Sequence, residues 1–256
     1  MKIPILMYHM IATTDNSEEK RYSVSPKAFK KQVLYLKHNG YSPIAIDALQ
    51  RYFYDKSGSL PPKPVAITFD DGYMDNYENA FPALREHNFP ATIFIVSGLV
   101  GKKNVWTQTG KYSEKPLMRW NEVKEMASGG ITIGSHTLSH PRLSFLSLRA
   151  AVTEIEGSKK NIEDRLGIEV DHFAYPYGDM NESVVEIVRE AGYKTACSTM
   201  SGFNTESVDK LLLRRLEICG SDSLWQFGAK LKFGTNEGTL LIPARYYMKR
   251  LAERFF

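Results

Sequence analysis

Short apolar runs and stretches with helical periodicity alternate along the whole chain. The runs are nearly continuous in apolar residues, as is typical of strands that are buried on both faces of a parallel sheet. They predict strands at residues 3–8, 44–46, 66–69, 91–96, 131–134, 172–175, 194–198 and 213–218. The stretches between them predict helices at residues 26–38, 47–54, 76–87, 121–128, 146–166 and 182–191.

Residues at the ends of these helices support the assignment. Ser25 and Pro26 are an N-cap and a first helical residue in the preferred order. Glycine or asparagine follows several of the helices, as at Asn39-Gly40, Gly167 and Gly192, where a left-handed residue commonly ends a helix. The sequence therefore predicts repeated units of helix, stop and strand.

This repetition indicates an α/β fold in which helices cover a parallel sheet, either closed as a barrel or open and doubly wound. We favour the barrel because polar residues follow several predicted strands, at the end where a (β/α) barrel builds its active site. These residues are His9, Asp70, Asp71, His136, His140 and Tyr177.

Composition narrows the class of protein. The length of 256 residues is typical of one α/β barrel, so we expect a single domain over residues 1–256. The net charge of +4 is mild and argues against nucleic-acid binding. Cys197 and Cys219 are too few for a disulfide framework. Since no run resembles a signal peptide or a membrane span, we expect a cytoplasmic protein.

Two carboxylates, Asp70 and Asp71, end the predicted strand 66–69, and they repel each other unless a cation compensates them. Adjacent strand side chains point to opposite faces, so one carboxylate can ligate a metal while the other stays free as a base. The alternative is a turn in which an aspartate caps the following helix.

His136 and His140 are four residues apart, which lets both imidazoles reach one ion from a single turn at the strand end. Pro141 disfavours helical geometry at His140 and so confines this turn. Two imidazoles and one carboxylate suit Zn²⁺ with open positions for water and substrate. The same ligand types also serve Fe²⁺, Co²⁺ or Ni²⁺, so the ligands alone leave the metal open.

Three segments together resemble the first three motifs of the polysaccharide deacetylases with a NodB-type domain, also called carbohydrate esterase family 4. They are Thr68–Tyr73, His136–His140 and Phe173–Gly178, and the resemblance covers roughly residues 63–200. It implies an irregular (β/α)7 barrel.

The resemblance also implies a role for each matching residue. Asp70 is the catalytic base, and Asp71, His136 and His140 bind a divalent metal. The backbone N–H of Tyr177 stabilises the tetrahedral oxyanion.

The chain departs from the family pattern in three places. Ala174 stands where the third motif has an arginine that orients the base, the fourth motif has no clear counterpart, and the late strand at 213–218 carries no histidine. For the missing arginine we choose Arg215. For the missing acid we choose His9, because Met-Tyr-His at the end of a first strand resembles the poly-N-acetylglucosamine deacetylases, a subgroup with an apparently permuted motif order.

We therefore expect a metal-dependent N-deacetylase of an N-acetylated amino sugar that releases acetate. One alternative is a deacetylase of a small or lipid-linked cytoplasmic sugar, and another is a degenerate member that binds sugar without turnover. Trp106 and Tyr112 lie in a loop that could stack on a sugar or cover the barrel. The segment 239–256 has an apolar helical face with basic residues elsewhere, so we expect either a final helix packed on the barrel or a peripheral membrane contact.

Overall fold

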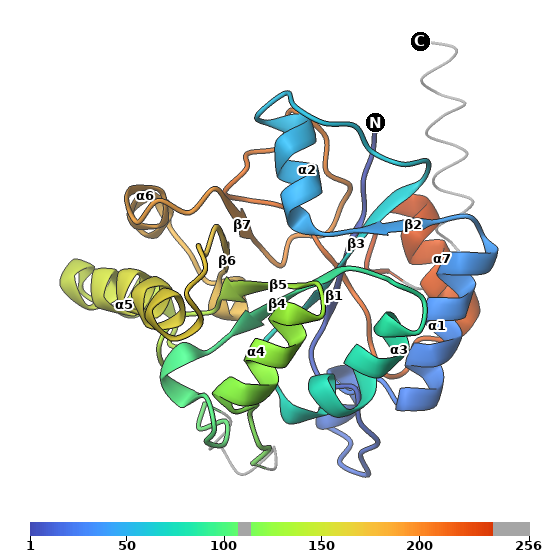
Figure 1. Cartoon of the computed structure of the whole chain (residues 1–256), viewed down its shortest axis with the longest axis horizontal. Helices are drawn as coiled ribbons and strands as arrows, with labels where there is room; N and C mark the ends of the chain where they lie inside the picture. Colours follow the sequence, from blue (N-terminus) through green and yellow to red (C-terminus); the bar gives the residue numbers. More distant parts are fainter. Residues whose placement is uncertain (107–113, 238–256) are drawn as a thin grey trace.

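The fold is built on one parallel sheet, seen in the computed structural model, which describes residues 1–106 and 114–237. The strands follow the order β7-β6-β5-β4-β3-β1-β8, and β2 pairs with β3 beside this path. Helices surround the curled sheet (Figure 1). The strands are β1 (Ile5–Tyr8), β2 (Ser42–Ile44), β3 (Pro64–Phe69), β4 (Ala91–Ile95), β5 (Ile131–Ser135), β6 (His172–Ala174), β7 (Thr195–Cys197) and β8 (Leu216–Glu217).

One segment connects the two edges of the sheet. Leu213 forms a parallel bridge with Cys197 of β7, and three residues later Leu216 pairs with Leu6 of β1. The chain thus changes partner from the last strand to the first within a few residues, which closes the curled sheet irregularly. The predicted strand at 213–218 is divided for this reason, and only Leu216–Glu217 count as β8.

Most of the helices lie where the periodicity predicts them. Ser25 accepts a hydrogen bond from the Ala28 N–H, which confirms the predicted cap, and Gly167 adopts the left-handed conformation after α5. The α-helices are α1 (Pro26–His38), α2 (Ile46–Phe53), α3 (Phe81–Arg85), α4 (Trp120–Ser128), α5 (Leu148–Leu166), α6 (Glu182–Glu190) and α7 (Leu224–Phe233).

Three further elements differ from the prediction. The strand expected at 44–46 begins two residues earlier, at Ser42–Ile44, and so includes Pro43. A proline is tolerated there because this short strand pairs with β3 alone, beside the main path of the sheet. The helix expected at 76–87 is a π-helical turn, Asn76–Ala80, followed by α3, in which Pro82 has no N–H to donate. Helix α7 was not predicted, although Ser223 and Gln226 form a capping box at its start.

Strand residues alternate between two apolar layers. Leu6 and Tyr8 belong to the large cluster that packs the sheet against the helices. Ile5 belongs to a smaller cluster inside the barrel, together with Ala66 and Phe94. His9 lies four residues after Ile5, and Asp70 lies four residues after Ala66. Because strand side chains alternate with a period of two, both point to the same inner side and line the cavity at the carboxyl ends of the strands.

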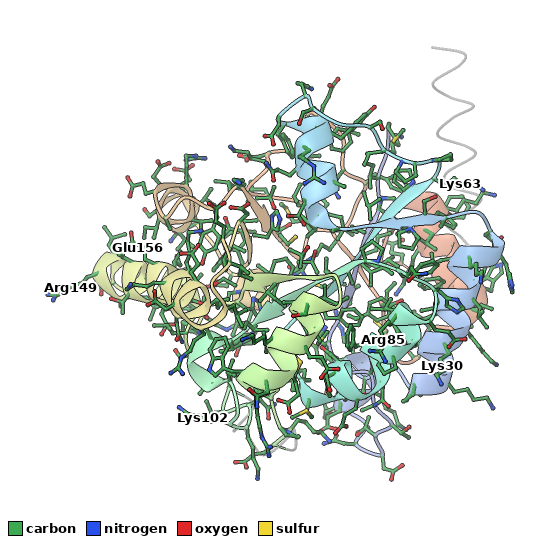
Figure 2. All side chains as sticks on the ribbon, viewed as in Figure 1. Lys30, Lys63, Arg85, Lys102, Arg149 and Glu156 are labelled. Carbon is green, nitrogen blue, oxygen red and sulfur yellow. The ribbon has the colours of Figure 1, made fainter. Side chains whose placement is uncertain are left out.

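Charged residues are spread over the outside of the molecule (Figure 2). The labelled side chains of Lys30, Arg85 and Arg149 lie at exposed positions of three different helices, and that of Lys102 lies in an exposed loop. Among the described residues, no helix combines the length and the apolar character that a bilayer crossing requires. The amphipathic segment 239–256 lies outside the described residues, as does Tyr112.

Candidate active site and metal centre

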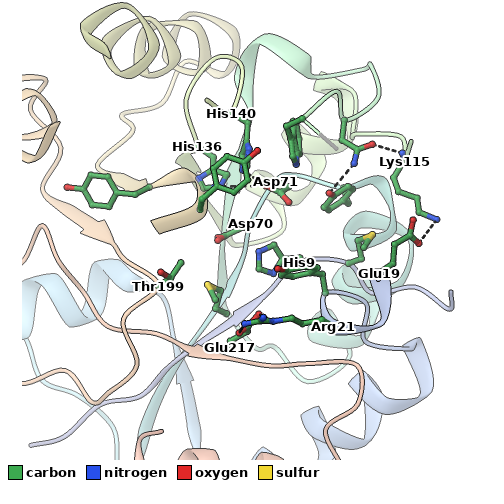
Figure 3. A pocket seen from close by; sticks show the side chains of 18 of the residues that line it. His9, Glu19, Arg21, Asp70, Asp71, Lys115, His136, His140, Thr199 and Glu217 are labelled. Carbon is green, nitrogen blue, oxygen red and sulfur yellow. Dashed lines mark hydrogen bonds and ion pairs between the residues drawn. The ribbon is translucent and has the colours of Figure 1, made fainter. Parts of the chain in front are cut away.

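Asp71, His136 and His140 come together as the sequence predicts. Their ligand atoms lie within 4.8 Å of one another, and all three side chains are buried. Asp71 Oδ1 is 3.5 Å from His136 Nε2 and 3.2 Å from His140 Nε2. The three residues follow β3 and β5, whose carboxyl ends open into the same cavity (Figure 3).

The contacts of His136 show which of its ring nitrogens carries the proton. Its Nδ1 lies 2.7 Å from the carbonyl oxygen of Ala174, and because a carbonyl only accepts, Nδ1 carries the proton. Burial lowers the pKa of His136 to about 4, so the ring is neutral near pH 7. A neutral ring protonated at Nδ1 presents an electron pair at Nε2, and this pair faces the Asp71 carboxylate.

Two electron-rich groups that face each other in a buried place need a cation between them. Asp71 Oδ1 and His140 Nδ1 are both buried and have no hydrogen-bond partner among the described residues. Burial works to raise the pKa of Asp71, but His140 beside it holds that pKa below its usual range, so the carboxylate is ionised. The donor set of one carboxylate and two imidazoles therefore fits a divalent cation.

Backbone strain is concentrated at this cluster. Asp71, Thr137, His140 and Tyr177 have φ values of 74°, 69°, 63° and 59°, in the left-handed region that residues other than glycine rarely adopt. At Asp71 the left-handed turn brings its side chain to the cavity beside Asp70. The expectation that the two carboxylates face opposite sides is therefore wrong, although they have different partners. Such strain is characteristic of functional sites.

The loop between the two histidines is a bend at the end of β5 and not part of a helix, as Pro141 leads us to expect. The N–H of His140 donates to Thr137 Oγ1 at 2.9 Å. Glu154 of α5 accepts hydrogen bonds from the N–H groups of Leu138 and Ser139, both at 2.9 Å. Sequence reasoning missed Glu154, because nothing in the pattern of the long helix distinguishes it from its other acidic residues.

Asp70 has a different partner from Asp71. Arg215 binds it through both carboxylate oxygens, at 2.6 Å from Nη1 to Oδ1 and 2.8 Å from Nη2 to Oδ2. Arg215 is fully buried, and its Nε donates to the Ser198 carbonyl oxygen at 2.9 Å. Burial works to raise the pKa of Asp70, but the Arg215 charge opposes it and the pKa lies below its ordinary value.

His9 follows β1 and lines the same cavity. Its ring packs edge-on against Tyr22 with centroids 5.2 Å apart. His9 lies between the Asp70 and Glu217 carboxylates in Figure 3. The structure therefore brings His9 to the site, where the sequence predicts it.

Aromatic rings surround His140. Trp106 stacks on the imidazole with ring centroids 4.4 Å apart, and Tyr177 packs against it edge-on at 4.6 Å. The guanidinium of Arg142 lies 4.3 Å from the centre of the Tyr177 ring, which is itself partly exposed. These rings give the cavity an apolar wall beside its polar floor.

The cavity has a volume of about 680 Å³ and includes two ion pairs that sequence reasoning missed. Arg21 donates twice to the Glu217 carboxylate, at 2.9 Å and 2.7 Å, and Lys115 lies 3.2 Å from Glu19. Glu19 and Arg21 belong to a short 3-10 turn, Lys115 to a loop and Glu217 to the two-residue strand β8, and none of these segments carries a recognisable motif. His172, at the start of β6, is buried, and its Nε2 lies 3.1 Å from Asp47 Oδ1.

Comparisons with known proteins identify the family of this arrangement. The family model described as polysaccharide deacetylase matches residues 57–196, more than half of the chain. The chain belongs to the polysaccharide deacetylase family. The family resemblance drawn from the three motifs is thereby confirmed, and the protein is by family a hydrolase.

Relatives in two bacteria share much of the sequence. YxkH of Bacillus subtilis (strain 168), a polysaccharide deacetylase by name, is 32% identical over 232 residues, which are 90% of this chain and 76% of that protein. The poly-beta-1,6-N-acetyl-D-glucosamine N-deacetylase of Staphylococcus aureus (strain MRSA252) is 30% identical over 190 residues, which are 71% of this chain and 62% of that enzyme. The chain thus matches less than two thirds of the staphylococcal enzyme's length.

Solved structures share the fold over most of its length. The Streptococcus pyogenes deacetylase PplD, in complex with acetate, has a TM-score of 0.76 and 28% identity, covering 88% of this chain and 95% of that one. IcaB from Ammonifex degensii has a TM-score of 0.77 and 27% identity, covering 90% and 97%. The expected NodB-type barrel is thereby confirmed.

Proposed function

We propose that the protein is a metal-dependent hydrolase that removes the acetyl group from an N-acetylated amino sugar. The observation that carries the proposal is that the two adjacent carboxylates have different partners. Asp71 joins His136 and His140 in a cation site, whereas Asp70 is held by Arg215 at the same cavity. The names of the S. aureus and S. pyogenes relatives, both deacetylases, support this reaction.

A divalent cation held by Asp71, His136 and His140 would supply a Lewis acid for the acetyl carbonyl and lower the pKa of a bound water. Zn²⁺ is our choice, with Fe²⁺, Co²⁺ and Ni²⁺ as alternatives that use the same ligand types. The Ala174 carbonyl fixes the proton of His136 on Nδ1, which keeps Nε2 available as a ligand.

Asp70 acts as the general base. Arg215 keeps Asp70 ionised and, by bonding to both of its oxygens, fixes the orientation of the carboxylate. The carboxylate can then take a proton from the attacking water. Water adds to the carbonyl carbon, the C–N bond then breaks, and acetate and the free amine leave. The backbone N–H of Tyr177 donates to the oxygen that becomes negative during this addition.

His9 acts as the general acid. The amine leaves an amide readily only when it is protonated, and histidine can carry a proton near neutral pH. The position of His9 in the cavity, opposite the metal ligands in Figure 3, supports this role. His9→Ala should retain metal and fold, lose about 10²-fold or more in turnover, and lose the alkaline limb of the pH profile. Turnover near the wild-type value would contradict the assignment.

The substrate is an N-acetylated amino sugar in a polysaccharide, oligosaccharide or glycoconjugate. A cavity of about 680 Å³ with Trp106 and the half-exposed Tyr177 ring in its wall can take a sugar against aromatic faces. A small or lipid-linked sugar is the alternative that a cytoplasmic location would favour. The non-catalytic alternative loses its main support, because Arg215 contacts Asp70 in place of the missing motif arginine.

The experiment is acetate release from N-acetylglucosamine polymers, oligomers and lipid-linked sugars, measured together with metal content. We expect acetate from at least one of these substrates, its loss on chelation and its return with Zn²⁺. Release from the polymer would identify the leading substrate class, and release from the lipid-linked sugar alone would identify the alternative. Sugar binding by the metal-loaded protein without acetate release would contradict the proposal.

A further inference from the structure

The residue we assign as the acid, His9, lies where β1 leaves the sheet. The pairing of β1 with β3 ends at Tyr8, whose carbonyl accepts the N–H of Asp70 at 2.9 Å. One residue after His9, Met10 pairs instead with the segment around Ser23, through bonds to Tyr22 and Val24. His9 therefore has no regular strand pairing to fix its backbone, and its direction depends on other contacts.

Three side chains from one short segment supply these contacts. Asn76 Nδ2 donates to the His9 carbonyl oxygen at 2.8 Å. Asp75 Oδ1 accepts the N–H of Ile11 at 2.7 Å, and Asn79 Nδ2 donates to the Ile11 carbonyl oxygen at 2.9 Å. The backbone on both sides of Met10 is thus bound by polar side chains at good hydrogen-bond distances.

The amide of Asn76 is itself fixed in place. Asn76 is fully buried, and its Nδ2 also donates to Asp75 Oδ1 at 2.9 Å. Both partners are acceptors, so the nitrogen of the amide must face them. Asn76 begins the π-helical turn that follows the Asp70-Asp71-Gly72 segment, and π-helical turns occur often at functional sites.

We infer that Asn76 is a positioning residue for His9, and that Asp75 and Asn79 assist it. This rests on the proposed role of His9 as the acid. Asn76 links the backbone of the acid, just after β1, to the segment that follows the base and a metal ligand just after β3. Together with the strand pairing that ends at Tyr8, this buried amide fixes the distance between acid and base. A displacement of about 1 Å at a reacting group can reduce turnover by about 10²-fold.

The test is a double-mutant cycle on kcat with the metal-loaded enzyme. Asn76→Ala should lower kcat by roughly 10- to 100-fold, the cost of a misplaced group, with metal content and KM little changed. In the His9→Ala background, the same substitution should lower kcat by less than about 2-fold, because the group it positions is gone. Asn79→Ala, at a partly exposed site, should act in the same direction and is less disruptive to folding.

Asn204→Ala is the matched control. Asn204 is also fully buried, and its Nδ2 donates to the carbonyl of Ile3, just before the other end of β1, at 3.4 Å, and to that of Arg214 at 2.8 Å. It should destabilise the fold without a comparable loss of kcat. This control separates a role in positioning from a role in stability alone.

The outcomes distinguish the two proposals. Equal losses of kcat from Asn76→Ala in both backgrounds, or wild-type kcat in Asn76→Ala and Asn79→Ala, would overturn the inference while leaving the acid in place. Wild-type kcat in His9→Ala would overturn the acid assignment and the inference with it, although acetate release by the wild-type enzyme would still support the deacetylase. Loss of kcat in Asn76→Ala that vanishes in the His9→Ala background supports the inference.

Discussion

The Asp70–Arg215 pair permits a quantitative prediction. Arg215→Met replaces the guanidinium by an apolar side chain and leaves the Asp70 carboxylate, 3% exposed, without its cation. Removing one partner of a buried ion pair costs about 3–5 kcal/mol. For a protein of this size, 1 kcal/mol corresponds to a melting-temperature change of about 2–4 °C, so the variant should melt roughly 6–20 °C lower.

The second arm of this experiment removes the other partner. Asp70→Asn with Arg215→Met leaves no buried charge, so the double variant should regain most of the lost stability in denaturant unfolding. If the double variant is destabilised by the sum of the two single effects, or if Arg215→Met costs less than about 1 kcal/mol, the two residues do not act as a buried pair.

The same substitution has a consequence for activity. With Arg215 present, the pKa of Asp70 lies below its ordinary value, so the base is ionised. At a pH above that ordinary pKa, the ionised pair therefore stabilises the fold. This contribution is lost as the pH falls through the lowered pKa. Without Arg215, burial raises the pKa of Asp70. The acidic limb of the pH–kcat profile should therefore move to higher pH, and an unmoved limb would contradict the role of Asp70 as the base.

Two further predictions concern residues that hold the site. Burial raises the pKa of Asp75 from 3.8 to about 6, so the folded protein keeps a proton that the unfolded chain loses, and the unfolding free energy should fall by up to roughly 3 kcal/mol as the pH rises through this window. In Asp75→Asn, the unfolding free energy measured by urea titration should fall much less over this pH range. An unchanged dependence of that free energy on pH would refute the role given to Asp75. Glu154→Ala should weaken Zn²⁺ binding about 10- to 100-fold in chelator competition, because it leaves the loop between the metal ligands unsupported, whereas Glu156→Ala on the exposed face of α5 should not.

The sequence predicts well what depends on strand alternation. His9 and Asp70 lie at even steps from residues of the inner layer, Ile5 and Ala66, so their place in the cavity follows from the pattern. The same argument applies to Arg214 and Arg215, of which only one can face the barrel, and it is Arg215 that is buried. The motifs supplied the assignments, and the alternation explains why they converge.

Contacts between distant elements were not predictable in this way. The bond from Asn76 to the His9 backbone depends on a π-helical turn, and no periodicity distinguishes such a turn from an α-helix. The left-handed backbone at Asp71, which turns its side chain to the cavity, is equally hidden in the sequence. Helix α7 is a different case, because its capping box at Ser223 and Gln226 can be recognised from the sequence.

The central claim is that the adjacent carboxylates have separate roles, with Asp71 as a metal ligand and Asp70 as the base. The most direct measurement is metal stoichiometry together with turnover in Asp70→Asn and Asp71→Asn, each purified and loaded with Zn²⁺ in the same way. We predict that Asp70→Asn keeps the wild-type metal content and loses most of its turnover, whereas Asp71→Asn loses both. Loss of bound metal in Asp70→Asn, or full metal content in Asp71→Asn, would contradict the account.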